Sequence, residues 1–307
     1  MSHNHNHAHG TNKKALLISF IIITIYMIIE AIGGFLTNSL ALLSDAGHML
    51  SDSISLGVGL LAFTLGEKTA NYSKTYGYKR FEILAAIFNG VTLILISIYI
   101  FYEAFHRLAE PPAVASTGML FIASIGLLIN ILVAWILMRK GDTKGNLNIR
   151  AAFLHVIGDL LGSVGAVIAA LLIMFLGWNL ADPIASVIVA ILVLISGWRV
   201  TKDAVHILME GTPEDVDVDE VIQTIENVTG IISIHDLHVW SITSGQNALS
   251  CHAVINGALT VQESQKILRT IEQELIQKNI HHVTIQMESG DHSHDDSLIC
   301  KINQESE

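Results

Sequence analysis

The first two thirds of the chain consist of long apolar runs separated by short polar connections. The runs lie at about residues 15–36, 39–65, 81–105, 117–138, 151–177 and 182–200. Each approaches or exceeds the roughly 18 to 20 apolar residues that cross a bilayer as a helix. From about residue 205 the sequence is mixed in polarity, as in a soluble protein. The pattern therefore predicts six membrane-spanning helices followed by a C-terminal domain of about 100 residues.

The sequence of the C-terminal part predicts secondary-structure elements in the order helix, strand, strand, helix, strand. Its elements are expected as helices at residues 217–228 and 260–278 and as strands at 231–243, 248–255 and 283–287. Alternation of apolar and polar positions identifies the strands, and apolar positions three or four apart identify the helices. Thr260, followed three residues later by Glu263, has the pattern of a capping box. These elements form a small open-faced α/β sandwich.

Composition agrees with a membrane protein that carries a soluble domain. Hydrophobic residues make up 51% of the chain and charged residues 15%, against roughly 25% charged in soluble domains. The net charge of −11 comes largely from the soluble end, which argues against nucleic-acid binding. We divide the chain into a His-rich cytoplasmic tail (1–14), a six-helix membrane domain (15–204), a cytoplasmic α+β domain for dimerisation and metal binding (205–290) and an acidic, His-containing tail (291–307).

Basic residues predict the orientation in the membrane. All but one of those near the spans fall on one side of a six-span arrangement, and the exception is Arg107. By the positive-inside rule, both termini and the connections at 66–80 and 139–150 are cytoplasmic. The first apolar run is too long for a signal peptide. The short connections favour a bacterial inner-membrane protein, and Cys251 and Cys300 are expected to be reduced thiols on the cytoplasmic side.

Two of the predicted spans carry ionisable side chains in their interiors, in the same pattern. The second span contains His48 and Asp52, and the fifth contains His155 and Asp159. A spacing of four residues puts both side chains on one face of a helix, about 6 Å apart along its axis. Two such helices facing each other would offer two imidazoles and two carboxylates to a single point.

The cost of burying these groups in a membrane points to a metal. One Asp at the bilayer centre costs about 2.5–3.5 kcal/mol, so the pair needs a compensating interaction. Two nitrogens and two oxygens suit four-coordinate Zn²⁺, whereas Mg²⁺ and Ca²⁺ prefer more oxygen ligands and Cu(I) prefers thiolates. The alternative is that His48 and His155 are hydrogen-bonded core residues. The repeated pattern favours the metal site, and Asp45 either supports its ligands from outside or lies on the exit side.

Other polar residues within the spans have a simpler interpretation. They are expected to be hydrogen-bond partners between helices, which is the usual role of such side chains in membranes. The residues concerned are Glu30, Asn89, Glu103 and Asn130.

Five motifs together resemble the cation diffusion facilitator family, and within it the bacterial zinc exporters. They lie at residues 43–52, 76–82, 155–159, 182–186 and 234–240, in the family's order and across nearly the whole chain. The resemblance implies a homodimer that exports Zn²⁺ from the cytoplasm in exchange for protons, and it implies no enzymatic activity. It places the transport site on His48, Asp52, His155 and Asp159, with His48 favouring zinc over cadmium.

The same resemblance bears on the soluble domain. It implies a ferredoxin-like, metallochaperone-like fold that dimerises and holds a cytosolic zinc site on His235, His252 and Glu288. This chain has Gln286 where some members have a further histidine.

The two tails have a metal-binding composition, and the interrupted spacing of the first histidines favours a native tail over a purification tag. Histidines occupy positions 3, 5, 7 and 9 and recur at 292 and 294. Three other functions are alternatives to zinc export. An intramembrane metalloenzyme would carry His-Glu-x-x-His or several His-rich boxes, and the sequence has neither pattern. A metal sensor that binds ions without moving them has no use for paired charged sites in two spans. A transporter of Mn²⁺, Fe²⁺, Co²⁺ or Cd²⁺ stays open, because imidazole and carboxylate serve several of these ions.

Overall fold

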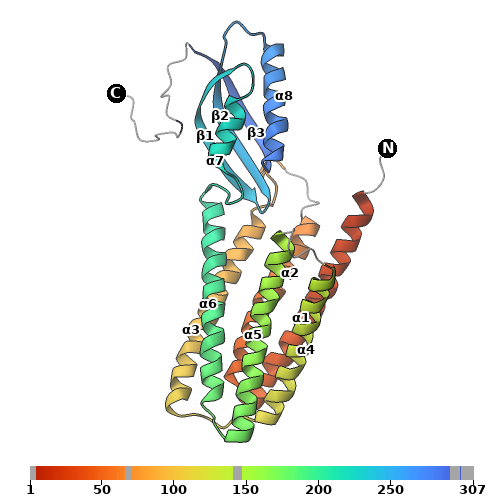
Figure 1. Cartoon of the computed structure of the whole chain (residues 1–307), viewed down its shortest axis with the longest axis vertical. Coiled ribbons are helices and arrows are strands. Elements are labelled where there is room, and N and C mark those ends of the chain that lie inside the picture. The colour runs from red at the N-terminus through yellow and green to blue at the C-terminus, as the bar shows by residue number, and fades with distance from the viewer. Residues whose placement is uncertain (1–4, 66–70, 141–146, 291–297, 299–307) are drawn as a thin grey trace. The chain divides into compact units, whose positions relative to one another are not determined.

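The computed structural model describes residues 5–65, 71–140, 147–290 and 298 (Figure 1). Side chains are described for fewer of them, and those of residues 5–16, 18, 19, 55, 56, 59–65, 133–140 and 147–158 lie outside the description. The contacts divide the chain into two compact units. One consists of residues 1–67 and 85–202, and the other of residues 68–84 and 203–307.

The first unit contains the six predicted helices. They are α1 (His5–Thr37), α2 (Leu40–Leu65), α3 (Phe81–Ala109), α4 (Ser116–Lys140), α5 (Leu147–Leu176) and α6 (Ala181–Leu208). The prediction of six helices is confirmed, with edges displaced by a few residues at most of their ends. The largest difference is that α1 is helical from His5 rather than from about residue 15. Hydrogen bonding within a long helix continues into polar residues, so an apolar run marks the buried part of a helix rather than its end.

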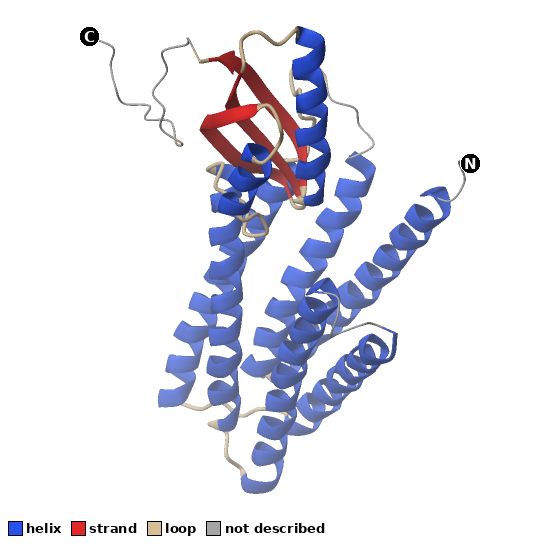
Figure 2. Cartoon of the chain, turned by 45° about the horizontal axis from the view of Figure 1, so that its top comes forward, coloured by secondary structure: helices blue, strands red, loops and turns tan. Residues whose placement is uncertain are grey.

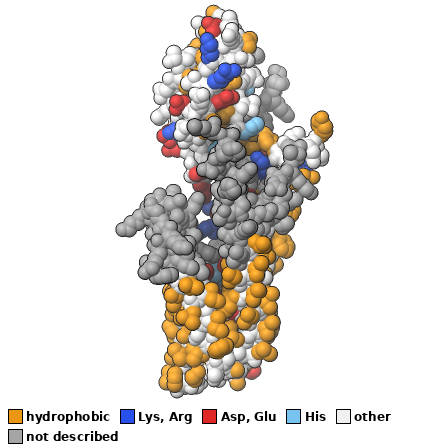
Figure 3. Space-filling view, turned by 90° about the vertical axis from the view of Figure 1, so that its right-hand side faces the viewer, with side chains coloured by type: hydrophobic (Ala, Val, Ile, Leu, Met, Phe, Trp, Pro, Cys, Tyr) orange, Lys and Arg blue, Asp and Glu red, His pale blue; other side chains and the backbone are white. Residues whose placement is uncertain are grey.

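Length and composition allow four helices of the described chain to cross a membrane. These segments are Phe20–Thr37, Phe81–Ala109, Asp159–Leu176 and Ala181–Leu208, and Ser116–Leu132 is a shorter apolar helix. Their outward faces carry large exposed apolar side chains such as Phe35, Phe105 and Trp198. Figure 3 shows these apolar groups gathered over the helices. An apolar surface of this extent is stable in lipid and not in water.

Small residues let the helices approach closely. Helix α1 packs against α2 and α4, α4 against α5, and α2 against α5. The largest buried cluster of the membrane unit is built mainly from alanines, at positions 41, 123, 166, 169, 170, 181 and 185. Because lipid tails offer no hydrophobic force between helices, such close van der Waals packing is what holds them together.

Polar contacts between helices confirm two of the four predicted partners. Asn89 Nδ2 on α3 donates to Ser51 Oγ on α2 at 2.8 Å, and Asn130 Nδ2 on α4 donates to Ser163 Oγ on α5 at 3.0 Å. The prediction was wrong for Glu103, because Arg107 lies four residues later on α3 and donates to its carboxylate at 2.8 Å. An ion pair of this spacing forms within one helix.

The second unit has the predicted order of elements. They are α7 (Val218–Glu226), β1 (Ile231–Thr243), β2 (Gln246–Ile255), α8 (Val261–Gln277) and β3 (Ile280–Ser289). The three strands form one sheet (Figure 2). Strand β2 is central in it, antiparallel to β1 and parallel to β3. The predicted capping box is present, with Thr260 and Glu263 bonded reciprocally. Strand β3 is longer at both ends than expected.

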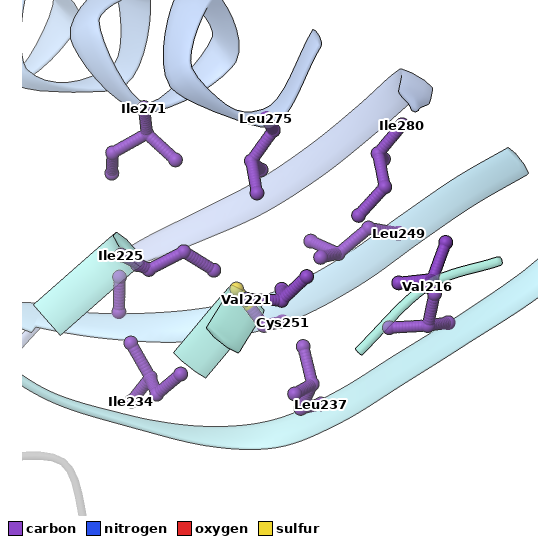
Figure 4. Packing of buried hydrophobic residues seen from close by; sticks show 12 residues of the cluster. Val216, Val221, Ile225, Ile234, Leu237, Leu249, Cys251, Ile271, Leu275 and Ile280 are labelled. Carbon is purple, nitrogen blue, oxygen red and sulfur yellow. The ribbon is translucent and has the colours of Figure 1, made fainter. Parts of the chain in front are cut away.

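Alternation along the strands separates two faces of this sheet. Leu249 and Cys251 of β2 point into the core that α7 and α8 cover (Figure 4), and Ala253 belongs to the same buried cluster. Ile271 and Leu275 of α8 pack into the same core. Because successive side chains of a strand point to opposite faces, the residues between them on β2 face away from the helices. The histidines of the soluble domain lie on that second face.

Residues Lys79 and Glu82, just before and within the first turn of α3, contact the hairpin of β1 and β2. Lys79 Nζ donates to Gln246 Oε1, and Thr243 Oγ1 donates to Glu82 Oε2 at 2.8 Å. Arg80 forms an ion pair with Glu210 at 3.0 Å. The connection between α2 and α3 is therefore tied to the soluble domain by specific polar contacts, up to the first turn of α3.

Candidate metal centres

Helices α2 and α5 bring three of the predicted transport-site residues together. His48 and Asp52 lie one turn apart on α2, and Asp159 lies on α5, which packs against it. One ligand atom of each residue lies within 4.8 Å of the others. His48 Nε2 is 2.9 Å from Asp159 Oδ1. One imidazole and two carboxylates from two helices therefore converge within reach of a single ion.

The fourth predicted residue lies outside the described side chains. His155 belongs to α5, one turn before Asp159, but its side chain is among those not described. Its backbone position puts it on the same face of α5 as Asp159. With its imidazole the group would have two nitrogen and two oxygen donors.

The site is enclosed but not sealed. The side chains of His48 and Asp159 are 16% and 18% exposed, and both lie well inside their helices. Gly47 lies next to His48, and a Cβ there would come within 2.9 Å of Ile96 on α3. Glycine thus permits α2 and α3 to approach beside His48. Limited exposure fits a site that ions must enter and leave.

Asp45 is placed differently from the three ligand candidates. It is 5% exposed and accepts a hydrogen bond from Ser163 Oγ of α5 at 3.4 Å. Gly162 of α5 leaves room for its carboxylate, since a Cβ at that position would lie 3.2 Å from Asp45 Oδ1. The group formed by His48, Asp52 and Asp159 does not take in Asp45 within the described part of the chain.

The soluble domain has a second group of candidate ligands, on the face of the sheet away from the helices. His235 of β1 and His252 of β2 are paired neighbours, with ring centroids 5.1 Å apart. Glu288 of β3 reaches both, with one oxygen 3.4 Å from His235 Nε2 and the other 3.0 Å from His252 Nδ1. All three predicted residues therefore meet, and their ligand atoms lie within 4.8 Å of one another.

Two neighbours of this group were not assigned a role from the sequence. Gln286 Nε2 donates to Glu288 Oε1 at 2.6 Å, so it orients the carboxylate rather than facing the histidines as a ligand. Asp236 Oδ2 lies 3.8 Å from His252 Nε2, and Asp236 Oδ1 lies 3.2 Å from His238 Nε2. Asp236 has a φ of 51° at an irregularity of β1, where the register shifts.

Cys251 is excluded as a ligand of this group. It points into the core, and burial, aided by the charge of Asp236, raises the pKa of its thiol to about 12. The thiol is thus protonated at neutral pH, whereas metal binding requires the thiolate. The tail histidines at positions 3, 292 and 294 lie outside the described residues, and those at 5, 7 and 9 have no described side chains.

Both parts of the chain match known protein families. Residues 16–209 match the cation efflux transmembrane domain, and residues 213–290 match the cytoplasmic domain of cation efflux proteins. A Bacillus subtilis protein named cadmium, cobalt and zinc/H(+)-K(+) antiporter is 68% identical over 301 residues, covering 98% of this chain and 97% of its own. The zinc transporter ZitB of Escherichia coli is 40% identical over 295 residues, covering 94% and 93%.

A relative with a sequence identity similar to that of ZitB comes from Cupriavidus metallidurans. Its metal cation efflux system protein CzcD is 42% identical over 287 residues, covering 93% of this chain and 89% of its own. A solved structure described as the metal-bound C-terminal domain of the CzcD transporter is 40% identical, covers 24% of this chain and 99% of its own, and has a TM-score of 0.22. Both family matches follow the chain in order and together cover nearly all of it. The chain is therefore a multi-pass membrane protein that belongs to the cation efflux family.

Proposed function

We propose that this protein exports Zn²⁺ from the cytoplasm in exchange for protons. The observation that carries the proposal is the convergence of His48, Asp52 and Asp159 inside the helices that cross the membrane. Intramembrane ionisable residues are costly and mark ion pathways. Membership of the cation efflux family supplies the direction of transport.

The chemistry of the donors favours zinc as the substrate. With His155, the group offers two imidazole nitrogens and two carboxylate oxygens, a set that suits tetrahedral Zn²⁺. Cd²⁺ and Co²⁺ are the further candidates, since the Bacillus subtilis relative is named for cadmium, cobalt and zinc and the Escherichia coli relative for zinc. The ligand set alone does not separate these ions sharply.

Proton exchange follows from the same groups. A metal needs neutral imidazoles and ionised carboxylates, so protons and metal compete for them. Imidazole ordinarily titrates within the pH range that separates a neutral cytoplasm from a more acidic exterior. We propose that the inward-facing site loses protons and takes up Zn²⁺, and that the outward-facing site is protonated and releases it.

We propose further that the protein is a homodimer in the cell (inner) membrane with both termini in the cytoplasm. The bias of Lys and Arg toward one set of connections supports this orientation. The match to the cytoplasmic domain of cation efflux proteins supports a cytosolic position for residues 213–290.

A second zinc site is proposed in that domain, on His235, His252 and Glu288. The two imidazoles and the carboxylate are mutually within 4.8 Å, and His235 and Glu288 are buried in the sheet surface. Three protein ligands leave one position of a tetrahedral ion for another donor. Asp236, near His252, is the adjacent carboxylate.

Reconstitution in vesicles tests the main proposal. Purified protein is incorporated into liposomes that contain a metal-sensitive dye, and uptake is compared for Zn²⁺, Cd²⁺, Co²⁺, Mn²⁺ and Fe²⁺. Zn²⁺ is expected to be taken up most efficiently. A protein that moves none of these ions would contradict the proposal, and one that prefers another ion would correct the substrate.

A further inference from the structure

Asp182, in the first turn of α6, is fully buried, and its carboxylate reaches the beginning of α2. Its Oδ2 accepts from the backbone N–H of Leu40 at 2.8 Å. Its Oδ1 accepts from the backbone N–H of Ala41 at 3.1 Å and from the hydroxyl of Ser39 at 2.6 Å. The three residues that donate are also buried. Both oxygens of one carboxylate on α6 are therefore used to hold the start of α2.

These bonds complete the hydrogen bonding at this end of α2. The first N–H groups of an α-helix have no partner within the helix. At α2, Ser39 N donates to the carbonyl of Gly34 on α1 at 3.0 Å, and Leu42 N donates to Ser39 Oγ at 3.2 Å. Asp182 accepts from the two N–H groups that lie between them. Without its carboxylate, two buried N–H groups would lose their partner, a condition that folded proteins seldom tolerate.

Charge also favours a carboxylate at this position. Asp182 lies in the first turn of α6 and against the first turn of α2, so it meets the partial positive charges of two helix N-termini. Arg107 Nη1, in the last turn of α3, is 4.0 Å from Asp182 Oδ2 and donates to the carbonyl of Asn38 at 2.7 Å. Arg107 therefore holds the turn that precedes α2, while Asp182 holds α2 itself.

The capped end of α2 lies close to the metal ligands that this helix carries. His48 follows Leu40 by eight residues, which is about 12 Å along the helix axis. The opposing ligand, Asp159, lies on α5, and only residues 177–180 separate α5 from α6. Asp182 thus joins α2 to the helix that directly follows α5. Because bonds to a metal tolerate errors of only about 0.2 Å, the height of α2 beside α5 determines how well the ligands converge.

We propose that Asp182 is a positioning residue for metal binding, which sets the height of α2 so that His48 and Asp52 meet Asp159. It acts through the backbone of α2 rather than by contact with the ion. When its carboxylate is lost, the first turn of α2 shifts, and the ligands remain but converge less well. The consequence is weaker binding of zinc rather than slower movement of bound zinc. The inference rests on the proposed function, because it concerns the ion that the centre would transport.

The experiment measures zinc uptake by vesicles as a function of zinc concentration, for the full-length protein and for Asp182→Asn. Asparagine keeps the size of the side chain, but its NH2 group replaces one acceptor oxygen and cannot accept from the N–H groups of α2. Ser186→Ala is the matched control. Ser186 is also fully buried, and its hydroxyl donates to the backbone carbonyl of Asp182 at 2.7 Å. The control therefore removes a buried bond within α6 that does not reach α2.

Asp182→Asn is expected to raise the KM for zinc about tenfold and to leave the maximal rate unchanged. Asp182→Glu keeps both acceptor oxygens and should recover part of the loss. A purely structural defect would instead reduce the amount of active protein, which lowers the maximal rate and leaves KM as it was. Ser186→Ala should have the KM of the unaltered protein. An unchanged KM in Asp182→Asn, or an equal rise in Ser186→Ala, would overturn the proposal.

Ser39→Ala provides the test if Asp182→Asn does not fold, because it removes one donor and leaves the carboxylate in place. It is expected to raise KM by a smaller factor, and an unchanged KM overturns the proposal.

Zinc binding in detergent, measured by calorimetry, separates this inference from the proposed function. If the unaltered protein transports no zinc, the proposed transport fails and binding becomes the test. The two proteins compared then also carry His252→Ala, which weakens the cytosolic group. Weaker zinc binding by Asp182→Asn than by Ser186→Ala supports the positioning role, and equal binding overturns it.

Discussion

His48 Nε2 and Asp159 Oδ1 are 2.9 Å apart, which joins α2 to α5 across the middle of the helix bundle. When the imidazole carries a proton on Nε2, this contact is an ion pair. A metal bound at that nitrogen has to displace the proton. His48 Nε2 and Asp159 Oδ1 are also proposed metal-binding atoms, so metal binding would replace their mutual contact with bonds to the ion.

Removing one carboxylate tests the centre directly. Asp159→Ala or Asp52→Ala leaves an incomplete set of ligands, so we expect zinc transport in vesicles to fall below detection. Loss of a group that merely orients a ligand already costs about 10- to 100-fold in metal affinity, and a lost ligand should cost at least as much. The variants should still insert in the membrane and purify as dimers. Glu110→Ala, at an exposed position that follows α3, is the control and should transport normally. Transport by either aspartate variant would contradict the assignment.

Substitution of the histidine tests selectivity. His48→Asp changes the proposed donors from two nitrogens and two oxygens to one nitrogen and three oxygens, which is a harder set. We expect the ratio of zinc to cadmium transport to fall. Uptake of both ions by the same vesicle preparation gives this ratio, and an unchanged ratio would show that His48 does not determine the choice between them.

The proposed zinc site on His235, His252 and Glu288 can be tested at its most accessible member. His252 is 22% exposed at its side chain, so His252→Ala should remove a ligand without disturbing the core. We expect the purified protein to retain about one zinc fewer per chain while zinc export continues at a reduced rate. His281→Ala, at an exposed position of β3 outside the group, serves as the control. Equal zinc content in both variants would mean that His252 binds no metal.

The capping box of α8 gives a prediction about stability. Glu263 accepts from the backbone N–H of Thr260 at 2.8 Å and from its hydroxyl at 2.7 Å, and these bonds lower the pKa of Glu263. Since the pKa is lower in the folded protein, this stabilisation is present above the unfolded pKa and is lost as pH falls through the folded one. In Thr260→Ala we expect amides of the first turn of α8 to exchange about fivefold faster at neutral pH. Thr270→Ala, in the same helix, should not change them.

The sequence predicted those features that depend on the spacing of residues within a single helix or strand. The length of the apolar runs indicated the helices, and the four-residue spacing of His48 and Asp52 put both on one face of α2. The pairing of Glu103 with Arg107 has the same four-residue spacing, so the carboxylate finds its partner within α3 rather than on another helix.

Contacts between elements were less accessible to sequence reasoning. No pattern in α5 indicates that Ser163 meets Asp45, because their approach depends on how α2 packs against α5. Gln286 could be identified as a departure from the family pattern, but its bond to Glu288 depends on side-chain direction at the end of β3. The position of Asp236 depends on an irregularity in β1 that shifts the register of a single strand.

The coupling of zinc to protons is the prediction that most directly separates antiport from passive diffusion. Each proposed ligand binds either a proton or the metal, so acid on the outer side favours metal release there. Zinc export measured in vesicles should therefore rise as the external side is acidified and stop when a protonophore collapses the gradient. In detergent, zinc binding should release protons, and a protein with both His48→Ala and His155→Ala should lose most of that signal. Export that is indifferent to the gradient would leave facilitated diffusion as the mechanism, even with the metal centre intact.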